Sequence, residues 1–182
     1  MNIYKNNQLT LTSSVVSIGA FDGLHRGHQT LIKEAAKRAR EWGVPSVVYT
    51  FNPPPRAYFQ NTKVLTSEEE KIELIKQLGI DYVVMADFNE AYASREAEEF
   101  LLELEFLCPR EIWVGPNFQF GKGKKGDVTL LSNYLPVKVH PLVRCEKGEI
   151  ISSTRIRELL QKDKRKQAYH LLGRPQMESL NI

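Results

Sequence analysis

The chain has 182 residues, of which 42% are hydrophobic and 26% are charged, so its composition is that of a globular domain with a sizeable core. A formal net charge of +3 is too small for a general nucleic-acid binder, and no apolar run approaches the roughly 18 residues that span a bilayer. The two cysteines, Cys108 and Cys145, form neither a disulfide framework nor a zinc signature. We therefore expect a cytoplasmic protein that binds neither nucleic acid nor a membrane.

Strand-like and helical patterns alternate along the chain. Short apolar runs predict strands over residues 15–18, 44–51, 82–86, 111–115 and 137–139. Apolar residues at helical spacing predict helices after residue 28 up to 42, over 66–78, over 94–107, near 128–134 and over 153–160. Strands separated by helices favour βαβ units with right-handed crossovers, so we predict an α/β fold with a parallel sheet flanked by helices.

The turn after the first predicted strand is the most informative segment. Residues 19–28 read Gly-Ala-Phe-Asp-Gly-Leu-His-Arg-Gly-His and lead into an amphipathic helix. Unpaired backbone N–H groups and the helix dipole favour an anion at such a turn. His25 and His28 can donate hydrogen bonds to phosphate oxygens and stabilise developing charge, so the segment predicts a bound nucleotide phosphate. The alternatives are a simple capping turn, or a transition-metal site with Asp22 as the one nearby carboxylate.

The segment 115–127 reads Gly-Pro-Asn-Phe-Gln-Phe-Gly-Lys-Gly-Lys-Lys-Gly-Asp. Its lysines form a cationic rim, whereas Phe118 and Phe120 offer flat apolar surface of the kind that covers an aromatic ring. Asn117 offers a donor and an acceptor that suit the edge of a heterocycle. The alternative is a solvated surface loop, because loops commonly have this composition.

The segment 151–157 reads Ile-Ser-Ser-Thr-Arg-Ile-Arg, and its hydroxyls precede a predicted helix. N-capping explains the hydroxyls, but Arg155 and Arg157 in the first turn oppose the helix dipole, which favours a bound phosphate there. The segment 50–56, Thr-Phe-Asn-Pro-Pro-Pro-Arg, is expected to be a rigid loop. The segments 19–28, 50–56 and 115–127 lie at the ends of predicted strands, and 151–157 lies one element later. We therefore expect all four to meet at the carboxyl edge of the sheet, where ligands bind in such folds.

Taken in this order, the segments 19–28, 50–56, 115–127 and 151–157 resemble the adenylyltransferase module of prokaryotic FAD synthetases. That module is usually the N-terminal half of a bifunctional riboflavin kinase/FAD synthetase and belongs to the nucleotidyltransferase superfamily marked by His-x-Gly-His. The resemblance covers residues 14–175. It implies a Rossmann-like nucleotidyltransferase fold and the Mg²⁺-dependent transfer of AMP from ATP to FMN, which yields FAD and pyrophosphate.

The resemblance also implies roles for individual residues. The implied catalytic residues are His25, His28 and Arg155. The implied ATP-binding residues are Gly19, Ala20, Phe21, Asp22, Gly27, His28, Ser153, Thr154 and Arg155. The implied FMN-binding residues are Phe51, Asn52, Arg56, Asn117, Phe118 and Asp127. No metal ligand is assigned with certainty, because Mg²⁺ would bind mainly through the substrate phosphates.

The chain departs from the family pattern in two places. Pro54 stands where family members usually have a histidine, and the Pro-Thr-Ala-Asn motif of the riboflavin kinase module is absent. We therefore expect an adenylyltransferase domain over residues 1–175, a tail over 176–182, no conversion of riboflavin to FMN, and a separate riboflavin kinase that supplies FMN.

Two other functions compete with FMN adenylyl transfer. The first is another nucleotidyltransferase of the same superfamily, acting on pantetheine phosphate, nicotinamide mononucleotide, or a sugar or glycerol phosphate. The second is a non-catalytic regulator that binds flavin or nucleotide. The absence of the usual histidine at Pro54 is the feature that keeps this alternative open. Phosphorylated acceptors tested with ATP and CTP separate the enzymes, and a regulator would bind FMN and ATP without releasing pyrophosphate.

Overall fold

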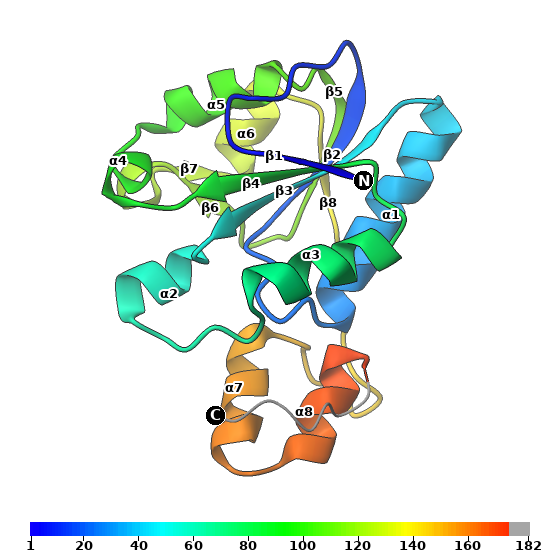
Figure 1. The fold of residues 1–182 in the computed structure, drawn as a ribbon, viewed down its shortest axis with the longest axis vertical. Coiled ribbons are helices and arrows are strands. Elements are labelled where there is room, and N and C mark those ends of the chain that lie inside the picture. The colour runs from blue at the N-terminus through cyan, green and yellow to red at the C-terminus, as the bar shows by residue number, and fades with distance from the viewer. Residues whose placement is uncertain (175–182) are drawn as a thin grey trace.

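The computed structural model describes residues 1–174, which form an α/β fold around one parallel sheet (Figure 1). The sheet has six strands in the order β1-β4-β3-β2-β5-β8, and every pair of neighbours is parallel. Its strands are β1 (Asn2–Tyr4), β2 (Ser14–Ile18), β3 (Ser46–Asn52), β4 (Tyr82–Asp87), β5 (Pro109–Val114) and β8 (Val137–Val139). A separate antiparallel pair consists of β6 (Gln119–Phe120) and β7 (Gly126–Asp127).

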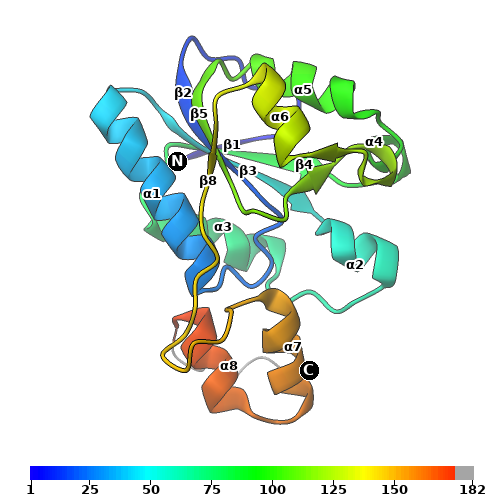
Figure 2. The same ribbon diagram turned by 180° about the vertical axis from the view of Figure 1, so that it is seen from behind.

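Helices cover both faces of the sheet, and a further helix pair lies beside it (Figures 1 and 2). The helices are α1 (Arg26–Trp42), α2 (Pro55–Gln60), α3 (Glu68–Gln77), α4 (Glu90–Ala93), α5 (Ala97–Glu105), α6 (Val128–Tyr134), α7 (Ser153–Gln161) and α8 (Arg165–Leu172), with a 3-10 turn over Lys122–Lys124. Helices α1 and α3 share a buried core with one face, whereas α5 and α6 share a core with the other. Helices α7 and α8 form a third core with each other.

The side chains of β3 alternate between the two faces of the sheet, so this one strand contributes to two cores. Val47 and Tyr49 pack with α5, whereas Val48 packs with α1 and α3, because successive side chains of a strand point to opposite faces. Residues 46–51 are all buried, as expected for a central parallel strand. The strand therefore carries its last residues, Phe51 and Asn52, to the carboxyl edge of the sheet.

The sequence predictions of the main strands and helices are confirmed, with shifted boundaries. The predicted strand 44–51 begins at Ser46, because Pro45 cannot donate to the ladder. The predicted helix 94–107 shortens to α5, and α4 precedes it as a separate turn. Strand β1, helix α8 and the β6–β7 pair were not predicted. The segment 50–56 was expected to be a loop, but helix α2 begins within it at Pro55. Proline is accepted in the first turn of a helix, because the N–H group that it lacks has no partner there.

The strand order creates one switch point. The chain moves from β2 through β3 to β4 on one side and places β5 and β8 on the other, so a crevice opens beyond the carboxyl ends of β2 and β5. The segments 19–28 and 115–127 follow these two strands. Within residues 1–174, no helix has both the length and the apolar character needed to cross a bilayer. The predicted tail 176–182 lies outside the described residues.

Candidate active site

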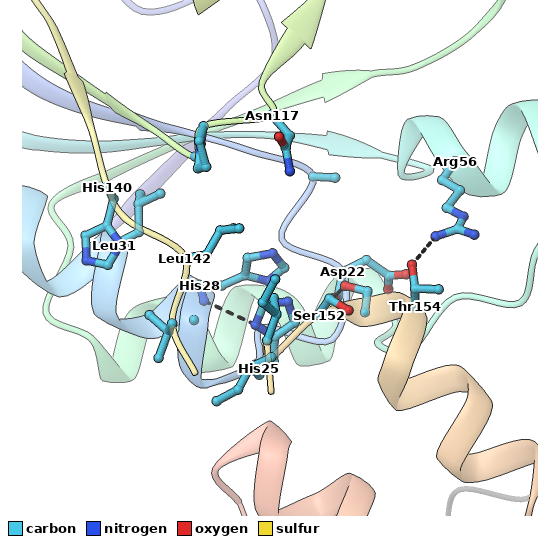
Figure 3. Close-up of a pocket in the computed structure, with 18 of the residues that line it drawn as sticks. Asp22, His25, His28, Leu31, Arg56, Asn117, His140, Leu142, Ser152 and Thr154 are labelled. Carbon is cyan, nitrogen blue, oxygen red and sulfur yellow. Dashed lines mark hydrogen bonds between the residues drawn. The ribbon is translucent and has the colours of Figure 1, made fainter. Parts of the chain in front are cut away.

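A cavity of about 420 Å³, here called the first cavity, lies at the switch point (Figure 3). It is lined by the turn after β2, the turn after β5, the segment after β8 and the start of α7. Its polar and charged lining residues are Asp22, His25, His28, Arg56, Asn117, His140, Ser152, Ser153, Thr154 and Arg157.

A second cavity of about 560 Å³ lies beside the first. Its walls are largely aromatic, and the rings come from Phe51, Phe59, Phe88, Tyr92, Phe100, Phe118 and Phe120. Such a space suits a flat ring system that stacks or packs edge-on against neighbouring rings. Ala20, Arg56 and Asn117 line both cavities, so the two spaces meet at these residues.

The two histidines of the first turn form one unit. His25 is the N-cap of α1, and its Nδ1 accepts a hydrogen bond from the backbone N–H of His28 at 3.3 Å. The rings stack with their centroids 3.6 Å apart. A Cβ on Gly27 would lie 3.2 Å from the His25 ring, so the absence of a side chain there lets the ring approach.

Both histidines are neutral at pH 7. Burial lowers the pKa of His25 to about 4. Burial, followed by repulsion from the protonated form of His25 and from Lys71, lowers the pKa of His28 well below its usual range. Because Nδ1 of His25 accepts a hydrogen bond, the proton of its neutral ring sits on Nε2. The pair therefore offers neutral N–H donors rather than a double positive charge.

Two buried polar atoms beside this cavity lack a partner. They are Nδ1 of His28 and Nη1 of Arg157, and both residues line the first cavity. An unpaired buried donor or acceptor costs about 1–3 kcal/mol, so such atoms indicate a missing hydrogen-bonding group. A ligand with several acceptor oxygens would satisfy Nη1 of Arg157, and also Nδ1 of His28 in the tautomer that places the ring proton there.

Asp22 links the turn 19–28 to the segment before α3 and to the start of α7. Its carboxylate accepts the backbone N–H of Leu65 at 2.8 Å and forms an ion pair with Arg157. Its backbone carbonyl accepts the hydroxyl of Ser153 at 2.8 Å. These contacts place the N-terminus of α7 against the turn that leads into α1, so two helix N-termini face the first cavity.

The two arginines at the start of α7 point to different places. Arg157 lines the first cavity, whereas Arg155 lines neither of the two cavities. Arg155 donates to Sγ of Cys145 at 3.4 Å and to the carbonyl of Ile150 at 3.3 Å, and it pairs with Glu149. The spacing of the motif carried this signal: Ser153 and Arg157 are four residues apart and share a helix face, but Arg155 does not.

The other predicted nucleotide-site residues divide into lining and supporting positions. Ala20 and Gly27 line the first cavity. Phe21 is buried and lies edge-on to the His28 ring at 5.3 Å between centroids. A Cβ on Gly19 would lie 2.7 Å from the Phe21 ring, so that glycine is needed for the approach. Gly19 and Phe21 therefore support the turn from beneath.

Four of the six predicted flavin-site residues line the second cavity, namely Phe51, Arg56, Asn117 and Phe118. Asn52 instead donates its amide to Glu68. Asp127 caps α6 by accepting the backbone N–H of Leu130 at 2.8 Å. Neither of these two side chains is among the residues that line a cavity.

Sequence reasoning missed Lys71, which is 1% exposed. Its Nζ donates to the carbonyl of Phe51 at 2.9 Å and to that of Ala20 at 3.2 Å, so it ties the ends of β2 and β3 together. Burial lowers the pKa of Lys71 to about 8, although the carboxylates of Asp22 and Glu68 oppose this. Among the residues of an amphipathic helix, a lysine gives no signal of burial.

Sequence reasoning also missed His140, which lines the first cavity directly after β8. Its place after a strand at the carboxyl edge was the available signal. No group of three or more His, Cys, Asp and Glu side chains in residues 1–174 is arranged to hold a metal ion.

A family model described as FAD synthetase matches residues 7–155. A protein from Geobacillus thermodenitrificans whose name pairs riboflavin kinase with FMN adenylyltransferase is 47% identical over 176 residues, which cover 96% of this chain and 98% of that protein. The bifunctional riboflavin kinase/FMN adenylyltransferase of Escherichia coli K12 is 34% identical, and the match covers 95% of this chain and 58% of that protein. This chain therefore spans less than two thirds of the Escherichia coli relative.

A crystal structure from Streptococcus pneumoniae, named as a macrolide-efflux protein, is similar in fold, with a TM-score of 0.84 and 34% identity. The match covers 96% of this chain and 62% of that one. The similarity in fold agrees with the parallel sheet and flanking helices described above.

Proposed function

The chain belongs to the FAD synthetase family, and from that premise we propose that it is an FMN adenylyltransferase, which transfers the adenylyl group of ATP to FMN. The observation that carries the proposal is a pair of unpartnered buried nitrogens, Nδ1 of His28 and Nη1 of Arg157. Both residues line a cavity that two helix N-termini face. Phosphate oxygens of ATP supply the acceptors that these atoms lack.

The adjoining aromatic cavity supports flavin as the second substrate. Its size and its ring walls suit the isoalloxazine of FMN, and Phe51 and Phe118 are the implied contacts. Because the two cavities share Ala20, Arg56 and Asn117, an FMN bound in one would present its phosphate to an ATP bound in the other.

The proposed reaction needs positioning and charge neutralisation. An oxygen of the FMN phosphate attacks the α-phosphorus of ATP, a new P–O bond forms, and the bond to the β-phosphate oxygen breaks with release of pyrophosphate. The FMN phosphate is already an anion, so no general base is needed. Neutral His25 and His28 donate hydrogen bonds to the phosphates, while Ser153, Thr154 and Arg157 bind them at the start of α7.

We propose Mg²⁺ as the cofactor of this reaction. Asp22 is the one carboxylate among the described residues that line the first cavity, and it is paired with Arg157. An ion held mainly by substrate phosphates fits this donor set, because Mg²⁺ keeps several waters and needs few protein ligands. When bound, it would neutralise charge on the phosphates.

The test is to incubate the purified chain with FMN, ATP and Mg²⁺ and to follow FAD and pyrophosphate by chromatography. We expect wild-type protein to form both products and His28→Ala to lose about 100-fold or more of the rate. His170→Ala is the matched control, because His170 is exposed and lies outside both cavities. Binding of FMN without pyrophosphate release would instead favour the regulator, and turnover of another phosphorylated acceptor would favour a different nucleotidyltransferase.

The supply of FMN requires a kinase that phosphorylates riboflavin, and we propose that a separate protein provides it in the cytoplasm. The match to the FAD synthetase family and the two cavities account for adenylyl transfer alone. Incubation of the purified chain with riboflavin, ATP and Mg²⁺ tests this, since appearance of FMN would contradict it.

A further inference from the structure

We propose that Arg56 is a catalytic residue, whose guanidinium contacts both the attacking FMN phosphate and the α-phosphate of ATP. The inference rests on the proposed adenylyl transfer and assigns Arg56 a role beyond flavin binding. Bond formation must take place where the two cavities join. The residues that line both are Ala20, Arg56 and Asn117, and of these Arg56 alone carries a charge.

Arg56 is held in place without being neutralised. It lies in the first turn of α2, and its Nη1 donates to the hydroxyl of Thr154 at 2.5 Å (Figure 3). Its Nε donates to the side chain of Gln60 at 2.9 Å. These bonds leave the second N–H of Nη1 and both N–H groups of Nη2 for a ligand. Within residues 1–174, Arg56 takes part in none of the ion pairs, so its positive charge is available to phosphate.

The other cationic side chains near the junction line only one of the two cavities, and two of them are already paired with a carboxylate. Arg157 lines only the first cavity and is paired with Asp22. Lys124 lines only the second cavity, as does Arg95, which is paired with Glu103. Arg56 is therefore the cation best placed to act on both substrates at once.

The chemistry at the junction requires such a group. Two phosphates that carry negative charge must approach each other, and further charge gathers on the oxygens of the α-phosphate as the bonds exchange. A guanidinium presents several N–H groups in a fixed plane and can bridge oxygens of neighbouring phosphates. Its effect grows as the bound substrates exclude water, because electrostatic interactions strengthen at lower dielectric.

The experiment compares Arg56→Ala, Arg56→Lys and the control Arg40→Ala in the FAD assay, with thermal unfolding as a check on folding. We expect Arg56→Ala to lower kcat about 100-fold while the KM values for FMN and ATP change by a few fold at most. Arg56→Lys should keep part of the rate because it retains a charge. Arg40→Ala, which removes an exposed arginine of α1 that lines neither cavity, should stay near the wild-type rate.

Chemical rescue separates a catalytic role from a structural one. Position 56 is exposed to solvent, so we expect millimolar guanidinium to restore part of the rate of Arg56→Ala. We expect no such rescue of His28→Ala. A raised KM for FMN with unchanged kcat would reduce Arg56 to a binding contact and overturn the proposal. A loss of kcat without rescue by guanidinium or by lysine would also overturn it. If the wild-type chain forms no FAD, the proposed function itself fails.

Discussion

The imidazole rings of His25 and His28 lie almost parallel, with their planes 20° apart and their centroids 3.6 Å apart. Two positive charges at this separation repel, and burial disfavours each of them. The stacked pair therefore remains neutral in the free protein. This arrangement predicts how stability depends on pH.

We expect stability to fall on acidification. The pKa of His25 is about 4 in the folded protein and about 6.5 when unfolded, so its contribution is present above pH 6.5 and is lost as the pH falls toward 4. For His25 alone, the free energy of unfolding should drop by about 2 kcal/mol between pH 7 and pH 5. Urea unfolding at the two pH values measures this drop.

Two variants make the pH experiment specific. His25→Asn removes the titrating ring and keeps an N-cap acceptor, so its stability should depend less on pH than that of the wild-type protein. His170→Asn, at an exposed position, should retain the wild-type decrease. An equal pH dependence in His25→Asn and wild type would contradict the assignment to His25.

The start of α7 gives a second prediction, which separates Arg155 from Arg157. We expect Arg157→Lys to lower kcat/KM for ATP by about 10-fold or more, because it removes a planar donor from the first cavity. Arg155→Lys should change kcat/KM for ATP much less, since Arg155 contacts the segment 145–150 instead. Steady-state kinetics with varied ATP measures both, and a larger effect at Arg155 would restore the role that the motif alone suggested.

Much of the fold follows from local patterns. Residues 15–18 and 82–86 are short apolar runs, and Ser67 followed by acidic residues starts α3 as a capping pattern predicts. The same patterns place the turn 19–28 at the carboxyl edge of the sheet. The short elements β1 and α2 escaped prediction because a few residues carry too little periodicity, and tertiary contacts decide their structure.

The direction of individual side chains was harder to predict. The motif 151–157 indicates a helix start with arginines, but the segment after β8 decides which arginine faces the cavity. Lys71 looks like a solvated helix position until α3 packs onto the sheet and buries it. Such features depend on packing between distant segments, and a single sequence does not contain that packing explicitly.

Lys71 gives a third prediction. Its pKa is about 8 in the folded protein and about 10.5 when unfolded, so the cost of its buried charge disappears as the pH rises from 8 toward 10.5. The wild-type protein should therefore gain about 2 kcal/mol from Lys71 between pH 7.5 and pH 9.5. Lys71→Met should lack this gain, whereas Lys76→Met, on the exposed side of the same helix, should keep it.

Lys71→Met should also raise the KM for FMN, because the carbonyls of Ala20 and Phe51 lose their shared donor at the edge of the second cavity. Urea unfolding at the two pH values and steady-state kinetics of the same samples measure both effects. If Lys71→Met keeps the wild-type pH dependence of stability and the wild-type KM for FMN, then the buried ammonium affects neither stability in this pH range nor FMN binding.

Phe59 gives the last prediction. It lines the second cavity and is 64% exposed, so its ring is available to a flavin without moving a packed core. Burying that ring against isoalloxazine should contribute about 1 kcal/mol, so Phe59→Ala should raise the KM for FMN about 5-fold and leave the KM for ATP unchanged. Leu102→Ala is the matched control, because Leu102 is 58% exposed on α5 and lines neither cavity. Quenching of flavin fluorescence measures FMN binding directly, and equal affinities for Phe59→Ala and Leu102→Ala would mean that the flavin does not reach Phe59.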